Sequence, residues 1–176
     1  ATSTPLVLFA LRRWRPFRQA TVGILTCFFM GYFLYVVFPA APPRLVLRSQ
    51  FTVSLQGYPQ GFAGLNQEAI DLLPVDSRAA FPSLHTAVSL LVLYYAWRHV
   101  RAWFWLALPL VLGLWASTIY LRHHYVADLL GGWALAPIAA WAAPRLDAWW
   151  TRRQRELGVK LALGAGEEAA GGAGAP

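Results

Sequence analysis

The chain of 176 residues is 57% hydrophobic and only 13% charged, and it contains nine tryptophans. This composition is more apolar than that of soluble globular domains, and it is typical of proteins that span a lipid bilayer. The formal net charge of +7 does not indicate nucleic-acid binding, because the basic residues lie in small groups between apolar runs rather than in one patch.

Four apolar segments are long enough to cross, or nearly cross, a hydrocarbon core about 30 Å thick. They comprise residues 19–38, 81–97, 102–120 and 126–143. We therefore predict an all-α fold, a multi-pass transmembrane helical bundle with four spans, in preference to the buried core of a soluble protein. Its membrane-embedded domain is expected at 19–145, after a preceding segment and basic turn at 1–18 and before a basic, then disordered, tail at 146–176.

The positive charges divide unequally between the two sides of this four-span arrangement. Four fall on one side: Arg44, Arg48, Arg78 and Arg122. The larger group falls on the other side: Arg12, Arg13, Arg15, Arg18, Arg98, Arg101, Arg145, Arg152, Arg153, Arg155 and Lys160. Basic residues are enriched in cytoplasmic connections, so the second group is expected to be cytoplasmic. We predict an integral membrane protein of a bacterial plasma membrane, with the smaller group on the extracytoplasmic face.

The first span ends in a proline-rich stretch at 39–43, followed by Arg44. Prolines stop the helix and favour extended backbone, which restricts the direction in which Arg44 points. Arg44 is a candidate phosphate ligand; the alternative is an arginine that only reaches lipid headgroups. The long connection at 45–80 contains helical spacing at 63–73, which predicts a short amphipathic surface helix and a lid over a substrate.

The second span opens with the sequence Phe-Pro-Ser-Leu-His at 81–85. Pro82 and Ser83 are typical of a helix start, and the N–H groups of a first helical turn form a ready anion site. His85 would lie within that turn, beside the anion. The alternative is that Ser83 only caps the helix and His85 only faces headgroups.

The richest polar stretch, 117–128, lies between the third and fourth apolar runs. Charged residues in such a position are costly and usually functional. His124 and Asp128 are four residues apart, so on a helix they would share a face, and the carboxylate could orient the imidazole. Gly131 and Gly132 follow and permit close helix approach. The alternative is a polar cluster in an ordinary loop.

Two histidines, an aspartate, a serine at a helix start and arginines on one membrane face suit phosphoryl transfer from a lipid. One imidazole can attack phosphorus and form a covalent phosphohistidine, while the other protonates the leaving oxygen. The scheme needs no metal or other cofactor. Two alternatives stay open: a zinc site built from His85, His124 and Asp128, and a nonenzymatic transporter or scaffold.

These motifs resemble the second and third signatures of the type 2 phosphatidic acid phosphatase superfamily, and most closely the branch with inositol phosphorylceramide synthases. The resemblance covers about residues 38–132 and implies a six-span core, of which this chain resembles the C-terminal four spans. It implies His124 as nucleophile, Asp128 as its orienting carboxylate and His85 as general acid. Ser83 falls where the family's serine helps to hold phosphate.

The sequence departs from the family pattern at two signatures. Thr118 follows Ser117 where an arginine is usual, and the first signature is reduced to Pro42, Pro43 and Arg44. We expect Arg44 and Arg122 to supply the missing positive charge, with Arg48 and Arg78 as substitutes for either.

The expected function is that of a lipid-phosphate phosphatase acting through a phosphohistidine. The alternative is a phosphotransferase that passes a phosphate head group to inositol or another alcohol, and hydrolysis is placed slightly ahead. The expected partners are a lipid phosphate or phospholipid substrate and the membrane, without nucleic acid. The sequence gives no indication of the oligomeric state.

Overall fold

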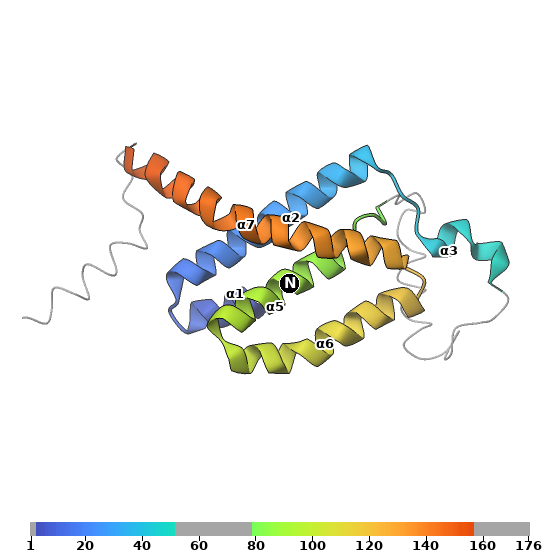
Figure 1. The fold of residues 1–176 in the computed structure, drawn as a ribbon, viewed down its shortest axis with the longest axis horizontal. Coiled ribbons are helices and arrows are strands. Elements are labelled where there is room, and N and C mark those ends of the chain that lie inside the picture. Colours follow the sequence, from blue (N-terminus) through green and yellow to red (C-terminus); the bar gives the residue numbers. More distant parts are fainter. Residues whose placement is uncertain (1–2, 52–78, 157–176) are drawn as a thin grey trace, which may run out of the picture.

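The computed structural model describes residues 3–51 and 79–156. Within them the chain forms a bundle of helices (Figure 1). The elements are α1 Ser3–Ala10, α2 Trp14–Val37, α3 Pro43–Val46, the short 3-10 helix η1 Arg48–Gln50, α5 Leu84–His99, α6 Arg101–Tyr120 and α7 Val126–Glu156. The predicted surface helix at 63–73, Arg78 and the predicted disordered tail from Gly164 lie outside the described residues.

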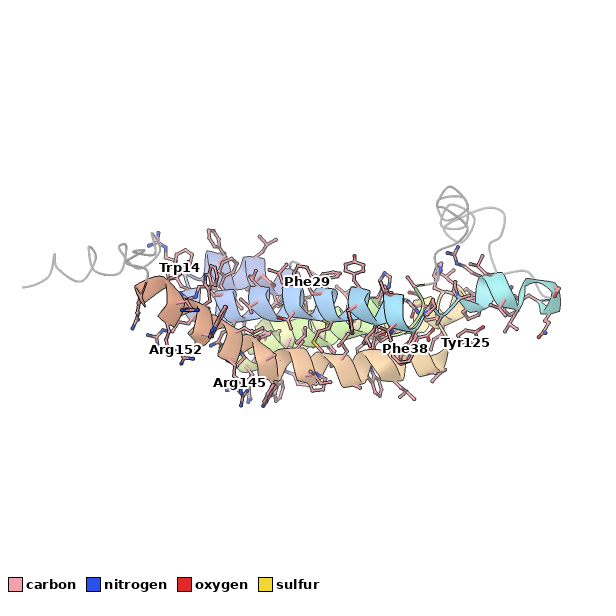
Figure 2. All side chains as sticks on the ribbon, turned by 90° about the horizontal axis from the view of Figure 1, so that it is seen from above. Trp14, Phe29, Phe38, Tyr125, Arg145 and Arg152 are labelled. Atoms are coloured by element: carbon pink, nitrogen blue, oxygen red, sulfur yellow. The ribbon has the colours of Figure 1, made fainter. Side chains whose placement is uncertain are left out.

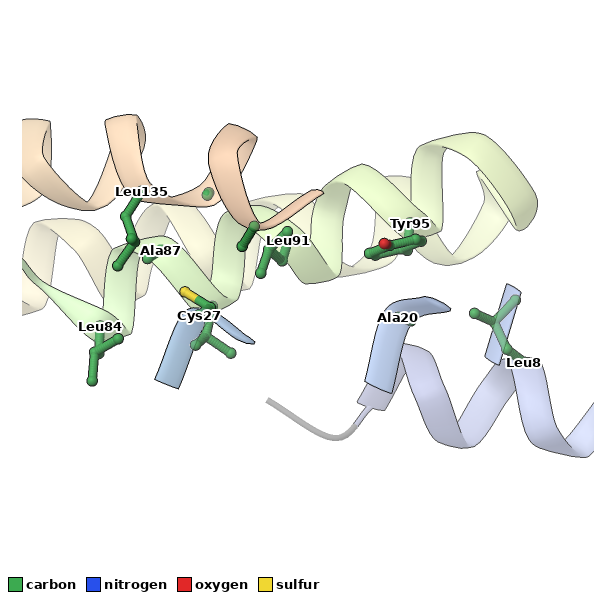
Figure 3. Packing of buried hydrophobic residues seen from close by; sticks show 11 residues of the cluster. Leu8, Ala20, Cys27, Leu84, Ala87, Leu91, Tyr95 and Leu135 are labelled. Carbon is green, nitrogen blue, oxygen red and sulfur yellow. The ribbon is translucent and has the colours of Figure 1, made fainter. Parts of the chain in front are cut away.

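Helix α5 is the centre of the bundle and packs against α1, α2, α6 and α7. Its buried side chains Leu84, Leu91 and Tyr95 lie in one core cluster with Cys27 of α2 and Leu135 of α7 (Figure 3). Cys27 is thus a core residue with a buried thiol. The site described below is built at one end of α5, so this packing fixes its position.

Outward-facing surfaces of the other helices expose large apolar side chains. Phe29 and Val36 of α2 are 74% and 81% exposed, and Leu110 of α6 is 72% exposed. Three helices, α2, α6 and α7, are long and apolar enough to cross a membrane. Helix α5 has 16 residues, about 24 Å at 1.5 Å per residue, and is enclosed by the others. A helical membrane bundle is thus confirmed, with a shorter central helix.

Helix α7 continues well past Pro144, where the sequence predicted its end. It runs to Glu156 and accommodates Pro137 and Pro144 in its interior. One stabilising contact is a two-point ion pair with α2: Nε of Arg18 lies 3.1 Å from Oδ1 of Asp147, and Nη2 lies 3.1 Å from Oδ2. Helix α2 also contains a proline, Pro16, which falls in its first turn, where proline is tolerated.

The two ends of the bundle differ in chemistry. Trp14, Arg145 and Arg152 lie toward one end, whereas Phe38 and Tyr125 lie at the other (Figure 2). Helices α2 and α6 end, and α5 and α7 begin, at the end marked by Phe38 and Tyr125. Every histidine except His99 is therefore delivered to one end of the bundle.

Candidate active site

The start of α5 is fixed by a buried serine cap. Ser83 is completely buried, and its Oγ accepts hydrogen bonds from the backbone N–H of Thr86 at 3.4 Å and from the Thr86 hydroxyl at 3.2 Å. The side chain thus satisfies a donor in the first helical turn, as expected for an N-cap. The predicted contact of Ser83 with phosphate stays a prediction, since Ser83 does not line the cavity described below.

Asp128 is the third residue of α7 and closes the start of that helix. Its Oδ2 accepts a hydrogen bond of 2.8 Å from the backbone N–H of Tyr125, the residue before the helix. This is the carboxylate half of a capping box. Its main-chain oxygen accepts a second hydrogen bond, 2.9 Å long, from the N–H of Ser83. Asp128 therefore joins the starts of α5 and α7.

The close approach of these two helix starts depends on Gly131 and Gly132. A Cβ atom at position 132 would lie 2.6 Å from the carbonyl oxygen of Ser83, and one at 131 would lie 2.6 Å from the Phe81 ring. Such separations are sterically impossible without movement of the backbone or the ring. The sequence prediction that these glycines permit close helix packing is confirmed.

His124 lies beside the carboxylate of Asp128. Its Nδ1 is 3.4 Å from Oδ2 of Asp128, and both side chains are buried. The sequence placed the pair on one helical face, but α7 begins only at Val126, so His124 precedes the helix. The two residues meet instead because Asp128 caps the helix start. Nδ1 faces the carboxylate, which makes Nε2 the candidate reactive nitrogen, and the backbone carbonyl of Ala80 lies near the same ring.

The charge state of His124 follows from its surroundings. Burial lowers the pKa of His124 below its ordinary value of 6.5, while the nearby Asp128 carboxylate and the backbone carbonyl of Ala80 act in the opposite direction. An imidazole with a lowered pKa is neutral at pH 7, which is the form that can act as a nucleophile.

His85 in the first turn of α5 faces His124 from the neighbouring element. The two ring centroids are 5.7 Å apart, with the ring planes inclined by 61°. Both rings line one cavity of about 490 Å³, whose other walls come from α2, α5, α6 and Ala79. Two imidazole rings from different elements thus border the same space.

The sequence model of the PAP2 superfamily matches residues 1–142 of this chain. The chain belongs to the PAP2 superfamily. This membership confirms the resemblance to the type 2 phosphatidic acid phosphatases that the motifs indicated. The three residues implied as catalytic, His85, His124 and Asp128, lie together in the structure of this superfamily member.

Curated relatives of this PAP2 member are 30–35% identical to it over the aligned residues. Inositol phosphorylceramide synthase of Candida albicans is 34% identical over 58% of this chain and 24% of its own length. Phosphoinositol dihydroceramide synthase of Bacteroides thetaiotaomicron is 35% identical over 58% of this chain and 37% of its own. The catalytic subunit aur1 of inositol phosphorylceramide synthase from Schizosaccharomyces pombe is 30% identical over 80% of this chain and 35% of its own.

The chain therefore spans about a quarter to three eighths of the length of these curated relatives. No solved structure matches the chain.

The predicted phosphate-binding arginines are joined through their backbones. The N–H of Arg44 donates a 3.1 Å hydrogen bond to the carbonyl oxygen of Arg122, which connects the reduced first signature to the third signature of the PAP2 pattern. Arg122 adopts a left-handed backbone with φ of 61°, and its guanidinium stacks 3.8 Å from the centroid of the Phe51 ring. Arg48 and Arg78, the predicted substitutes, have no described side-chain positions.

Arg44 acts electrostatically on the histidine next to the candidate nucleophile. The pKa of His123 falls to about 4, first because of burial and then because of the positive charges of Arg44 and neighbouring histidines. Arg44 therefore places positive charge near the histidine cluster, where an anion would be attracted.

Sequence reasoning missed the side chains that wall the cavity of this PAP2 member. Phe28, Tyr32 and Tyr35 line it from α2, and Ser89 lines it from α5. A signal was present, because the three aromatic residues recur at the spacing of one helical face, and Ser89 is four residues after His85. Within residues 3–51 and 79–156, no group of three or more His, Cys, Asp or Glu side chains is placed to hold a metal ion.

Proposed function

We propose that this PAP2 member is a membrane phosphotransferase or phosphatase that acts on a lipid phosphate through a covalent phosphohistidine on His124. The observation that carries the proposal is the buried contact of 3.4 Å between His124 Nδ1 and Asp128 Oδ2, facing His85 across one cavity. A histidine held in this way resembles the base of a nucleophilic triad, with its second nitrogen directed at the substrate. The proposed catalytic domain comprises 19–145.

In the first step, Nε2 of His124 attacks the phosphorus, and the bond between phosphorus and the leaving oxygen breaks. His85 gives its proton to that oxygen, which leaves as an alcohol. In the second step, an acceptor hydroxyl attacks the phosphohistidine while His85 takes its proton, and His124 is restored. Asp128 stabilises the positive charge that develops on the His124 ring in each step.

Charge on the transferring phosphate needs stabilisation from the protein. Arg44 is suited to this role by its proximity to the histidine cluster, as its effect on His123 indicates. The first-turn N–H groups of α5 add the positive end of a helix dipole, with Ser83 holding that turn in place. We assign Arg122 to the same phosphate, and its ring stack with Phe51 would position the guanidinium.

The acceptor distinguishes a transferase from a phosphatase. Water and an alcohol would meet the same phosphohistidine, so the site geometry is compatible with both. The relatives reported above have names that describe synthases of inositol phosphorylceramide and phosphoinositol dihydroceramide, which favours transfer to an alcohol over the hydrolysis that the sequence placed ahead. We propose transfer of a phosphate-bearing head group as the main activity and hydrolysis as the second candidate.

The proposed membrane orientation places this site on the extracytoplasmic face. Arg12 and Arg13 lie between α1 and α2, and Arg98 and Arg101 lie at the adjoining ends of α5 and α6, at the opposite end of the bundle. Basic residues in short connections are retained in the cytoplasm. A nonenzymatic transporter would need no nucleophile oriented by a carboxylate, so the enzyme is the better account.

The experiment uses the whole chain in lipid nanodiscs with phospholipids labelled at phosphorus. Each reaction is run alone, with inositol and with ceramide, because the relatives' names combine both alcohols. A labelled product that requires the added alcohol supports transfer, and release of the water-soluble head group or phosphate without it supports hydrolysis. The absence of turnover on phosphatidate, isoprenoid diphosphate and inositol lipids would refute the enzyme assignment.

A trapping experiment tests the nucleophile itself. Rapid denaturation during turnover should retain labelled phosphate on the wild-type protein and on His99→Ala, but none on His124→Ala. His99 is the matched control, because it lies at the far end of α5. Label retained on His124→Ala contradicts the assignment.

A chelator tests the metal-free scheme. Activity lost to a chelator and restored by zinc would contradict it.

A further inference from the structure

The cavity beside the two histidines has mostly apolar walls. Phe28 and Tyr32 line it from α2, Leu114 from α6 and Val88 from α5. Helix α5 packs against both α2 and α6, while α2 and α6 are not extensively packed against each other in the described part of the chain. A hydrocarbon chain attached to the phosphate would contact these apolar walls and be shielded from water.

Ser89 is a polar exception on the cavity wall. Its Oγ accepts a hydrogen bond of 2.8 Å from Nε1–H of Trp115 and donates one of 3.1 Å to the carbonyl oxygen of Thr86. A hydroxyl has one donor and two acceptor lone pairs. Among the described residues, these two bonds use the donor and one lone pair, so one lone pair remains on a residue that borders the cavity.

Ser89 lies one helical turn from His85, the proposed proton donor. It follows His85 by four residues on the same helix, so both lie on one face, about 6 Å apart along the axis. If phosphate is bound between His85 and His124, the lipid atoms a few bonds from phosphorus reach the level of Ser89. A hydrogen-bond acceptor at this depth would favour a lipid that has an N–H or O–H group at the same level.

We propose that Ser89 is a specificity-determining residue, which accepts a hydrogen bond from an N–H or O–H group on the lipid backbone near the phosphate-bearing carbon. This inference rests on the proposed function of the same site. The favoured substrate class is an N-acylated amino alcohol lipid, whose amide and hydroxyl can both donate. A diacylglycerol lipid with two ester links has no donor at that position.

The test compares matched amide-linked and ester-linked lipids of equal chain length, first as phosphate donors and then as free alcohol acceptors. The readout is the ratio of kcat/KM for the amide lipid to that for the ester lipid. Ser89→Ala should lower this ratio roughly 3- to 10-fold, the effect of one lost neutral hydrogen bond. Ser89→Thr keeps the hydroxyl oxygen and should retain the ratio.

Trp115→Phe is the control for a structural role, because it removes the indole donor and keeps the Ser89 hydroxyl. It should leave the ratio unchanged. The inference would be overturned if Ser89→Ala left the amide-to-ester ratio unchanged, or if Trp115→Phe lowered it equally, in a protein whose wild type turns lipids over. If Ser89→Ala does not fold, Ser89→Cys supplies a weak acceptor and should lower the ratio. Absence of any wild-type turnover would instead refute the proposed function.

Discussion

The backbone N–H of Ser83 donates a hydrogen bond of 2.9 Å to the carbonyl oxygen of Asp128. This contact joins the starts of two helices. Helix α5 carries the proposed acid, His85, and α7 begins two residues after the proposed nucleophile, His124. Since the Asp128 carboxylate also contacts Tyr125 and His124, one residue couples the geometry of the helix starts to that of the reactive imidazole. Changes in helix packing at this point should therefore affect catalysis.

Gly132→Ala should destabilise the bundle and reduce activity. The added Cβ would lie 2.6 Å from the carbonyl oxygen of Ser83 and 2.9 Å from Cβ of Thr86, so the two helix starts must separate. We expect a loss of about 1–3 kcal/mol in stability, measured by thermal unfolding in detergent. Gly113→Ala is the control, because nothing lies within 4 Å of its Cβ position. Equal losses in both variants would contradict this role of Gly132.

Asp128→Asn should reduce kcat by about 10²- to 10⁴-fold while the protein stays folded. The amide oxygen can still accept the hydrogen bond from Tyr125, but the amide cannot stabilise a positively charged His124 ring. Asp147→Asn removes a carboxylate at the opposite end of the bundle, where it pairs with Arg18, and should alter stability more than kcat. Steady-state rates and unfolding midpoints of both variants distinguish the two roles.

The helical bundle and the gathering of His85, His124 and Asp128 could be predicted because they depend on local signals. Apolar run length, cap residues and alternating topology determine which residues reach the same end. The extension of α7 could not be predicted, since one of its stabilising contacts joins Arg18 to Asp147, 129 residues later. The burial of Ser83 likewise depends on the packing of α7 over the start of α5.

Arg122→Ala should raise KM for the lipid phosphate about 10-fold, because it removes a cation assigned to the substrate phosphate. Arg12 provides a matched control. It is also a non-glycine residue with positive φ, 54° compared with 61° for Arg122, but it lies in the connection between α1 and α2. Arg12→Ala should leave KM unchanged. A similar rise in both variants would indicate a backbone effect rather than phosphate binding.

His85→Ala should slow substrates with basic leaving groups more than activated aryl phosphates. A general acid matters most when the leaving oxygen is basic and needs a proton as it departs. The measurement compares kcat/KM of lipid alcohol phosphates with that of p-nitrophenyl phosphate in the variant and the wild type. Equal losses for both substrate types would count against His85 as the acid.

His123 should make the stability of the protein depend on pH. Its pKa is lowered to about 4 by burial and by the positive charge of Arg44, whereas in the unfolded chain it would be near 6.5. As the pH falls from 6.5 to 4, the unfolded chain binds a proton that the folded state does not, so the folded state loses stability.

Unfolding midpoints measured in detergent across this range should decrease toward acid, and His123→Asn should reduce the slope. Arg44→Gln should raise the pKa of His123 and also reduce the slope, because it removes the repulsive charge. A wild-type slope retained in both variants would show that another group controls acid sensitivity.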